Sequence, residues 1–296
     1  MILQNEISKI GIGTWGIAGF LHHDKSVNTK TQLDALKKSF DLGANYIDCS
    51  LKYADGVSLQ VIQQLIQYAG RENLFISAKL EQFIEKPEDV NNQLNHYLKS
   101  LSIDKVDLLQ LHAPSFTKLS IHDTYKEIGK LIDSGKVMHA GASNFSVDQL
   151  AEAAVGCGTN LAIHESLFNF KFRQNEDAGI LRYCNENNIK FVAYQPLHRG
   201  KTEASGNTLL NELAKKYNKT QSQIILNWLI HKDIIPLVRS DNIQHLEEDF
   251  ASTSFVMEDY DYKLIDEYRD IETKSISIDW RDLGTGDSIY QIANRY

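Results

Sequence analysis

From Ile10 onward, short β-rich runs alternate with amphipathic helical patterns, and the alternation repeats at roughly 30-residue intervals, the length of a βα unit. Several runs lack polar alternation, as expected for parallel strands that are covered on both faces. Eight such units predict an α/β protein with a single (β/α)8 (TIM) barrel, whose functional residues belong at the carboxyl ends of the strands. The predicted strands are KIGIGT (9–14), NYIDC (45–49), LFISAK (74–79), VDLLQLH (106–112), KVMHAGAS (136–143), LAIHES (161–166), KFVAYQ (190–195) and IIPLV (234–238).

The helical patterns between these runs have recognisable ends. Gly43 can end one helix in the left-handed conformation, and Ser120 and Gly135 are a candidate N-cap and end for another. We expect one barrel domain over 1–296, with a short N-terminal extension and a C-terminal helix. The polar tail 271–296 is expected to be a lid, an added edge or a loose, partly disordered end. Helices are predicted over 31–43, 88–101, 120–135, 208–217, 221–232 and 257–270.

Length and charge exclude several other classes of protein. The 296 residues would allow two domains, but α/β barrels commonly reach ~250 residues as one. A formal charge of −8 argues against binding to nucleic acid or to an anionic membrane. No run reaches the ~20 apolar residues of a membrane span, and the chain start does not resemble a signal peptide. Cys49, Cys157 and Cys184 show no metal-binding spacing, so reduced structural thiols in a cytoplasmic protein are expected.

Four residues near the ends of the predicted strands have chemistry that fits together. Asp48 ends the second strand with Tyr53 beyond it, Lys79 ends the third, and His112 ends the fourth. A tyrosine with its ordinary pKa of about 10 is a poor acid, but a nearby ammonium favours its phenolate and a carboxylate can hold that ammonium. A histidine beside the phenol can orient a carbonyl oxygen. These residues predict a site where Tyr53 protonates a carbonyl oxygen while another group delivers hydride to the carbon.

Six segments in this order resemble the aldo-keto reductase family over roughly residues 8–255. They are GIGTW, LGANYIDCSLKY, FISAK, DLLQLHAPS, GKVMHAGASNFS and VAYQPL. The resemblance implies an NADP(H)-dependent oxidoreductase, without a metal, that acts on an aldehyde or ketone as a monomer or small homo-oligomer. It also implies a catalytic tetrad made of Asp48, Tyr53, Lys79 and His112.

The resemblance extends to the residues that bind cofactor and substrate. It places the nicotinamide against Ser143, Asn144 and the ring of Tyr194, and the pyrophosphate at the turn that contains Leu197 and Arg199. Trp15 and Phe116 would wall the substrate pocket. An arginine suits a phosphate dianion because it offers a planar fork of donors. The full set of cofactor residues implied is Gly13, Thr14, Ser143, Asn144, Glu165, Tyr194, Gln195, Leu197, Arg199, Arg239, Ser240, His245, Glu248 and Asp249.

Four positions depart from the family pattern. His245 stands where many members have an arginine; since histidine is mostly neutral at pH 7, we expect weaker discrimination for NADP(H) over NAD(H). Glu165 replaces a carboxamide-binding glutamine, so it can only accept a hydrogen bond there, and its charge would favour the oxidised ring. Leu59 and Gln63 replace an acidic residue and a glycine on the helix after Tyr53, where the packing should differ.

Two other functional classes stay open. The same barrel also serves as a non-catalytic, cofactor-sensing regulatory subunit, for which binding without turnover would be the mark. A lysine at a barrel strand end can also form a Schiff base, so Lys79 could belong to an aldolase. His112 is accompanied by no HxH or HExxH pattern, which argues against a metal site. His139, His164 and His198 are read as structural or rim residues, and Asp107 as a stabilising residue at the opposite end of the barrel.

Overall fold

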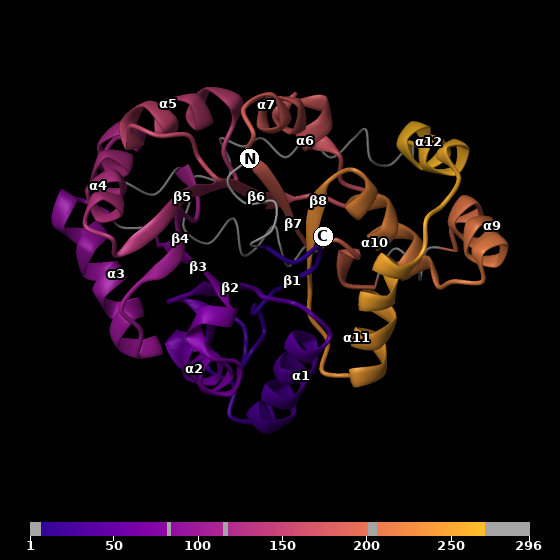
Figure 1. Cartoon of the computed structure of the whole chain (residues 1–296), viewed down its shortest axis with the longest axis horizontal. Coiled ribbons are helices and arrows are strands. Elements are labelled where there is room, and N and C mark those ends of the chain that lie inside the picture. Colours follow the sequence, from indigo (N-terminus) through magenta and orange to yellow (C-terminus); the bar gives the residue numbers. More distant parts are fainter. Residues whose placement is uncertain (1–6, 82–83, 115–117, 201–205, 270–296) are drawn as a thin grey trace.

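The computed structural model describes residues 7–81, 84–114, 118–200 and 206–269. Eight parallel strands form a closed barrel in the order of the sequence, which confirms the predicted fold class (Figure 1). Each predicted strand is present, and its bounds differ from the predicted ones by at most two residues at either end. The strands are β1 (Gly11–Ile12), β2 (Tyr46–Ser50), β3 (Phe75–Leu80), β4 (Val106–Leu111), β5 (Val137–Ser143), β6 (Ile163–Leu167), β7 (Lys190–Tyr194) and β8 (Ile234–Val238).

Helices surround the barrel as an outer ring (Figure 1). Two of them, α9 (Thr208–Tyr217) and α10 (Gln221–His231), lie between β7 and β8 as predicted. Short 3-10 helices η1 (Tyr53–Gly56) and η4 (His198–Gly200) follow β2 and β7. Among the described residues, the other α-helices are α1 (Thr29–Asp41), α2 (Val57–Ala69), α3 (Pro87–Leu101), α4 (Ile121–Asp133), α5 (Val147–Cys157), α6 (Gln174–Asp177), α7 (Ile180–Glu186), α11 (Ile243–Phe250) and α12 (Asp259–Glu267).

Local chemistry explains where the predicted helices begin and end. Ser120 caps α4, since its side chain accepts a hydrogen bond from the Asp123 backbone N–H. Gly43 follows α1 with a φ of +102°, a conformation that glycine adopts without steric cost. Pro87 opens α3, where its missing N–H would have no helical partner anyway. The capping residues therefore set the helix boundaries that periodicity alone leaves loose.

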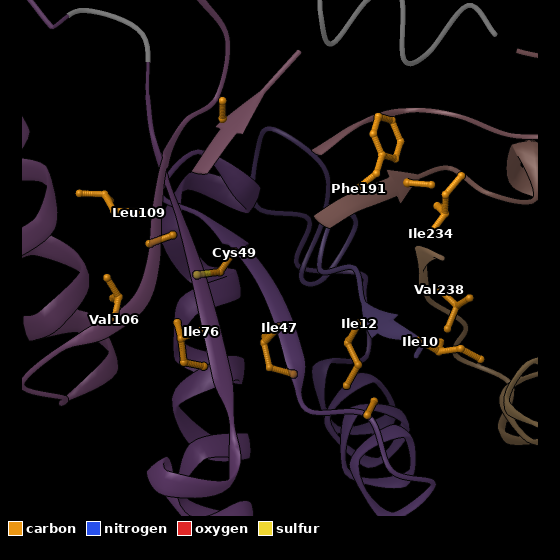
Figure 2. Packing of buried hydrophobic residues seen from close by; sticks show 14 of the residues in the cluster. Ile10, Ile12, Ile47, Cys49, Ile76, Val106, Leu109, Phe191, Ile234 and Val238 are labelled. Atoms are coloured by element: carbon orange, nitrogen blue, oxygen red, sulfur yellow. The ribbon is translucent and has the colours of Figure 1, made fainter. Parts of the chain in front are cut away.

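The strands divide their side chains between two apolar regions with a period of two residues. Outward residues such as Ile47 on β2, Ile76 on β3 and Leu109 on β4 pack against the helices in one large cluster (Figure 2). The inward residues Tyr46, Phe75, Leu108, Ile163, Val192, Ile235 and Leu237 belong to a second, smaller cluster that fills the barrel interior.

Helices α4 and α5 approach closely because each has a glycine at the contact. A Cβ atom added to Gly129 on α4 would lie 2.8 Å from the carbonyl oxygen of Cys157. A Cβ atom on Gly156 of α5 would lie 2.4 Å from the carbonyl oxygen of His122. Neither position has room for a larger side chain without movement of the backbone.

Cys49, Cys157 and Cys184 are buried and form no disulfide. Burial raises the pKa of Cys157 to about 11 and that of Cys184 to about 12.

Asp107 pairs with Arg71 at 2.7 Å near the start of β4, the position predicted for a stabilising residue. In the described part of the chain, no helix combines the length and apolarity needed to cross a bilayer. The tail 271–296, predicted as a lid or loose end, lies outside the described residues.

Candidate active site

The inward positions of the strands change from apolar to polar towards their carboxyl ends. On β2, Asp48 follows Tyr46 on the inner face, and on β3 the inner positions run from Phe75 to Lys79. On β6, Glu165 follows Ile163 in the same way. A set of buried charged side chains therefore lies next to the apolar cluster, on the side of the carboxyl ends of the strands.

Lys79 is the centre of these charges. Its Nζ atom lies 2.6 Å from Asp48 Oδ1 and 2.7 Å from Glu165 Oε1. The ammonium also donates a hydrogen bond to the Tyr53 hydroxyl at 3.2 Å. The structure thus brings three of the four predicted catalytic residues into direct contact and adds Glu165 to them.

Burial and mutual charge set the ionisation of this group. Burial alone would lower the pKa of Lys79, but the charges of Asp48 and Glu165 raise it well above its usual value. The pKa of Asp48 rises to about 7, chiefly because of burial and then because of the charge on Glu165, against the opposing effect of Lys79. Lys79 therefore remains an ammonium ion between two carboxyl groups, and Asp48 is fully ionised only above about pH 7.

Glu165 is the residue whose surroundings the sequence did not indicate. Its Oε2 atom accepts a hydrogen bond from Gln110 Nε2 at 3.0 Å, and the Tyr46 hydroxyl donates to it at 3.5 Å. With Oε1 on Lys79, both oxygens of a fully buried carboxylate have protein partners. The resemblance assigned this position to the cofactor carboxamide, and spacing along the chain carries no signal that β6 and β3 meet through these two side chains.

Glu81 is a second charged residue that sequence reasoning missed. Its Oε2 atom lies 3.3 Å from His112 Nδ1, and its Oε1 atom accepts a hydrogen bond from the Ser50 hydroxyl. Burial by itself would raise the pKa of Glu81. The electrostatic effect of His112 and the hydrogen bonds from His112 and Ser50 outweigh burial, so this pKa lies below its ordinary value. Glu81 lies two residues after Lys79, immediately beyond β3, and the period of two residues continued past the strand end was the available signal.

The loop after β2 holds Tyr53 at the mouth of the barrel. Ala54 and Asp55 in η1 have φ values of 51° and 53°, an uncommon conformation for residues other than glycine. The Ser58 hydroxyl donates to the Tyr53 carbonyl oxygen at 3.0 Å. The rings of Trp15 and Tyr53 meet edge to face, with centroids 5.0 Å apart. The loop therefore holds the backbone of Tyr53, and Trp15 packs against its ring.

One cavity of about 450 Å³ collects most of the predicted site residues. Phe116 lies outside the described residues. Thr14 and Ser143 are buried beside the cavity, and His245 is exposed on α11. Within the described chain, Thr14, Ser143, Ser240, His245 and Glu248 are not part of its lining. The predicted residues that line it are Gly13, Trp15, Asp48, Tyr53, Lys79, His112, Asn144, Glu165, Tyr194, Gln195, Leu197, Arg199, Arg239 and Asp249.

The cavity offers groups suited to an anionic dinucleotide. The guanidinium groups of Arg199 and Arg239 supply positive charge to its lining. The Tyr194 hydroxyl donates to Asn144 Oδ1 at 2.9 Å, which fixes an aromatic ring and a carboxamide side by side. Arg239 pairs with Asp241 at 2.8 Å, so a phosphate would share this guanidinium with a carboxylate. Two cations and an aromatic face in the cavity that also holds Tyr53 fit a nicotinamide dinucleotide.

Comparison with known proteins gives a consistent result. The model of the Aldo/keto reductase family matches residues 9–270. The methylglyoxal reductase YeaE of Escherichia coli is 27% identical over 248 residues, covering 82% of this chain and 84% of that protein. The NADPH-dependent alpha-keto amide reductase of Saccharomyces cerevisiae is 30% identical over 188 residues, 60% of each chain. The crystal structure of the thermostable aldo-keto reductase Tm1743, in complex with the inhibitor epalrestat, superposes with a TM-score of 0.82 at 30% identity, covering 89% of this chain and 96% of that one.

Proposed function

Because this chain belongs to the aldo/keto reductase family, we propose that it reduces an aldehyde or ketone with NADP(H), with Tyr53 as the proton donor. The observation that carries the proposal is the contact chain from Tyr53 through Lys79 to Asp48, with distances of 3.2 Å and 2.6 Å. Two relatives, the NADPH-dependent alpha-keto amide reductase and the methylglyoxal reductase, support the cofactor and the small carbonyl substrate.

Each side chain has a distinct role in this scheme. The bound cofactor supplies hydride to the carbonyl carbon. Tyr53 gives its hydroxyl proton to the carbonyl oxygen, and the Lys79 ammonium stabilises the negative charge that the tyrosine oxygen then carries. Asp48 holds Lys79 in place, and His112 orients the carbonyl oxygen. Trp15 walls the substrate side of the same cavity.

We assign the cofactor to the remaining lining of the cavity. Asn144 and Tyr194 would bind the nicotinamide, and Arg199 would bind the pyrophosphate. Arg239 would bind the 2′-phosphate, where Asp241 competes for it. Asp249 would reach the adenine. For Thr14, Ser143, Ser240, His245 and Glu248 the cofactor roles remain predictions from the resemblance.

The substitution Tyr53→Phe tests the proton donor. It removes only the hydroxyl, so we expect turnover of a panel of aldehydes and ketones to fall by about 10²- to 10⁴-fold while NADPH still binds. Loss of NADPH absorbance measures turnover, and quenching of protein fluorescence measures binding. Tyr68→Phe is the matched control, because Tyr68 is an exposed tyrosine on α2 that hydrogen-bonds Asp41. Undiminished turnover in Tyr53→Phe would exclude Tyr53 as the donor.

The same experiment separates the alternatives. Tight NADPH binding without turnover of any carbonyl would favour a cofactor-sensing subunit. A Schiff-base aldolase needs Lys79 as a free amine, and a lysine held by two carboxylates, with its pKa raised, is poorly suited to that role. Trapping of a substrate adduct on Lys79 by borohydride would nevertheless establish the aldolase and overturn the reductase proposal.

A further inference from the structure

Glu81 has no role in the proposed reduction, although several groups hold its side chain in one position. Its side chain is 6% exposed, and its two oxygens contact His112 Nδ1 and the Ser50 hydroxyl. Its backbone N–H donates to Gln93 Oε1 at 2.7 Å, which ties the end of β3 to α3. A carboxylate held in this way cannot rotate away from His112. The protonation state of His112 therefore has to match the fixed carboxylate.

The donor and acceptor chemistry of imidazole then limits the protonation states of His112. An ionised carboxylate only accepts hydrogen bonds, so His112 Nδ1 has to carry a proton. A neutral imidazole has a single N–H. This requirement places that proton on Nδ1 and leaves a lone pair on Nε2, which repels a carbonyl oxygen. Nε2 can donate to that oxygen only when both ring nitrogens are protonated.

We propose that Glu81 is a positioning residue that makes the imidazolium form of His112 the one that binds the substrate carbonyl. The inference rests on the reductase function proposed above. His112 keeps both of its protons throughout; Tyr53 still supplies the proton that reaches the oxygen, and hydride still comes from the cofactor. The imidazolium contributes a positive charge next to the oxygen as negative charge develops there.

The neighbouring charges agree with a cation at His112. Lys52 helps to keep Glu81 ionised, since it lowers the pKa of that carboxyl. Asp48 and Glu165 provide two carboxyl groups against the single ammonium of Lys79, so their combined field does not oppose another positive charge. The charged and titratable groups around the Glu81–His112 pair are Asp48 and Cys49 on β2, Lys52 and Tyr53 beyond it, Lys79 on β3, Tyr97 on α3 and Glu165 on β6.

The substitution Glu81→Gln gives a sharp test. A glutamine of the same shape can accept from Ser50 and donate its N–H to Nδ1, which allows a neutral His112 with its proton on Nε2. The wild-type kcat/KM for reduction should fall about tenfold per pH unit once His112 loses its proton, and this step should be absent in Glu81→Gln. Glu127→Gln on the surface of α4 is the matched control and should keep the wild-type profile. Identical pH profiles for wild type and Glu81→Gln would overturn the proposal.

Nitrogen NMR of the imidazole gives a readout that does not depend on turnover. In the cofactor-free wild type we expect both His112 nitrogens to be protonated at the lower pH, and Nδ1 alone to keep its proton after titration. In Glu81→Gln the neutral form should instead carry the proton on Nε2. A wild-type neutral form protonated on Nε2 would refute the role of Glu81. If the NMR result holds but no carbonyl is reduced, the reductase function fails while the effect of Glu81 on His112 stands.

Discussion

At the scale of single residues, the unusual feature is the second carboxylate on Lys79. Asp48 and Glu165 both contact the same buried ammonium, at 2.6 Å and 2.7 Å. When both are ionised, the group has one negative charge in excess, which is unfavourable in a site removed from water. A positively charged ligand next to Glu165 would relieve this excess. The oxidised nicotinamide ring is such a ligand, and the reduced ring is neutral.

Glu165→Gln should therefore change the preference between the two cofactor forms. We expect the affinity for NADP⁺ relative to NADPH to fall about tenfold, which corresponds to ~1.4 kcal/mol. Titration calorimetry with each form measures the ratio, and the relative rates of ketone reduction and alcohol oxidation should shift in the same sense. Equal changes in both affinities would show that Glu165 acts on the shared part of the cofactor and that its charge does not select the oxidised ring.

The site residues differ in how far the sequence could reveal them. Asp48, Lys79 and His112 could be predicted because parallel strands bring their carboxyl ends together, so a polar residue at each strand end is already placed. Glu81 could be predicted by the same reasoning, because it directly follows β3 and lies two residues after Lys79. The contact between Glu165 and Lys79 could not be predicted in this way. It crosses the barrel between β6 and β3, whose relative placement depends on how the barrel closes.

At the scale of elements, the strands were predicted well and their bounds less well. The eight runs were recognisable because a parallel strand covered on both faces is apolar throughout. β1 is reduced to Gly11–Ile12, although the run KIGIGT predicted a longer strand, because pairing with β2 and β8 involves only those two residues. Helix α5 was not among the predicted helices; its capping box of Ser146 and Gln149 was the signal present in the sequence.

The contact between α4 and α5 depends on glycine at position 156. In an isolated helix, Gly156→Ala would stabilise by up to ~1 kcal/mol. Here the added methyl group meets the His122 carbonyl oxygen at 2.4 Å, so we expect a net loss of about 1–3 kcal/mol in the free energy of unfolding. Urea denaturation measures it. Val155→Ala, on the exposed side of the same helix, should change the stability by less than ~0.5 kcal/mol. A stabilised Gly156→Ala protein would mean that the two helices can move apart at little cost.

At the scale of the whole molecule, the buried charges make stability depend on pH. The pKa of Asp48 is about 7 in the folded protein and ~3.9 in an unfolded chain. Between these values the folded state holds a proton that the unfolded state has released, so raising the pH through this window lowers the free energy of unfolding. From about pH 8 upward both states are ionised and the effect of Asp48 becomes constant.

Asp48→Asn should remove this dependence while Glu165 still pairs with Lys79. Relative to wild type, the variant should gain about 2 kcal/mol in the free energy of unfolding between pH 5 and pH 7, and less than ~0.5 kcal/mol more by pH 8. Urea midpoints of both proteins at the three pH values provide the measurement. A constant difference across the three pH values would mean that Asp48 stays ionised throughout the range and that burial does not hold its proton.

The burial of all three cysteines has a consequence for the working life of the enzyme. Aldehydes and ketones are electrophiles, and a carbonyl reductase meets them at every turnover. The thiolate is the form of cysteine that attacks electrophiles, and burial raises the pKa of Cys157 and Cys184 to about 11 and about 12. Cys49 is buried on β2, next to Asp48, and its pKa is raised as well. The folded protein therefore presents its own substrates with no reactive thiol, so loss of cysteine to these electrophiles should require unfolding first.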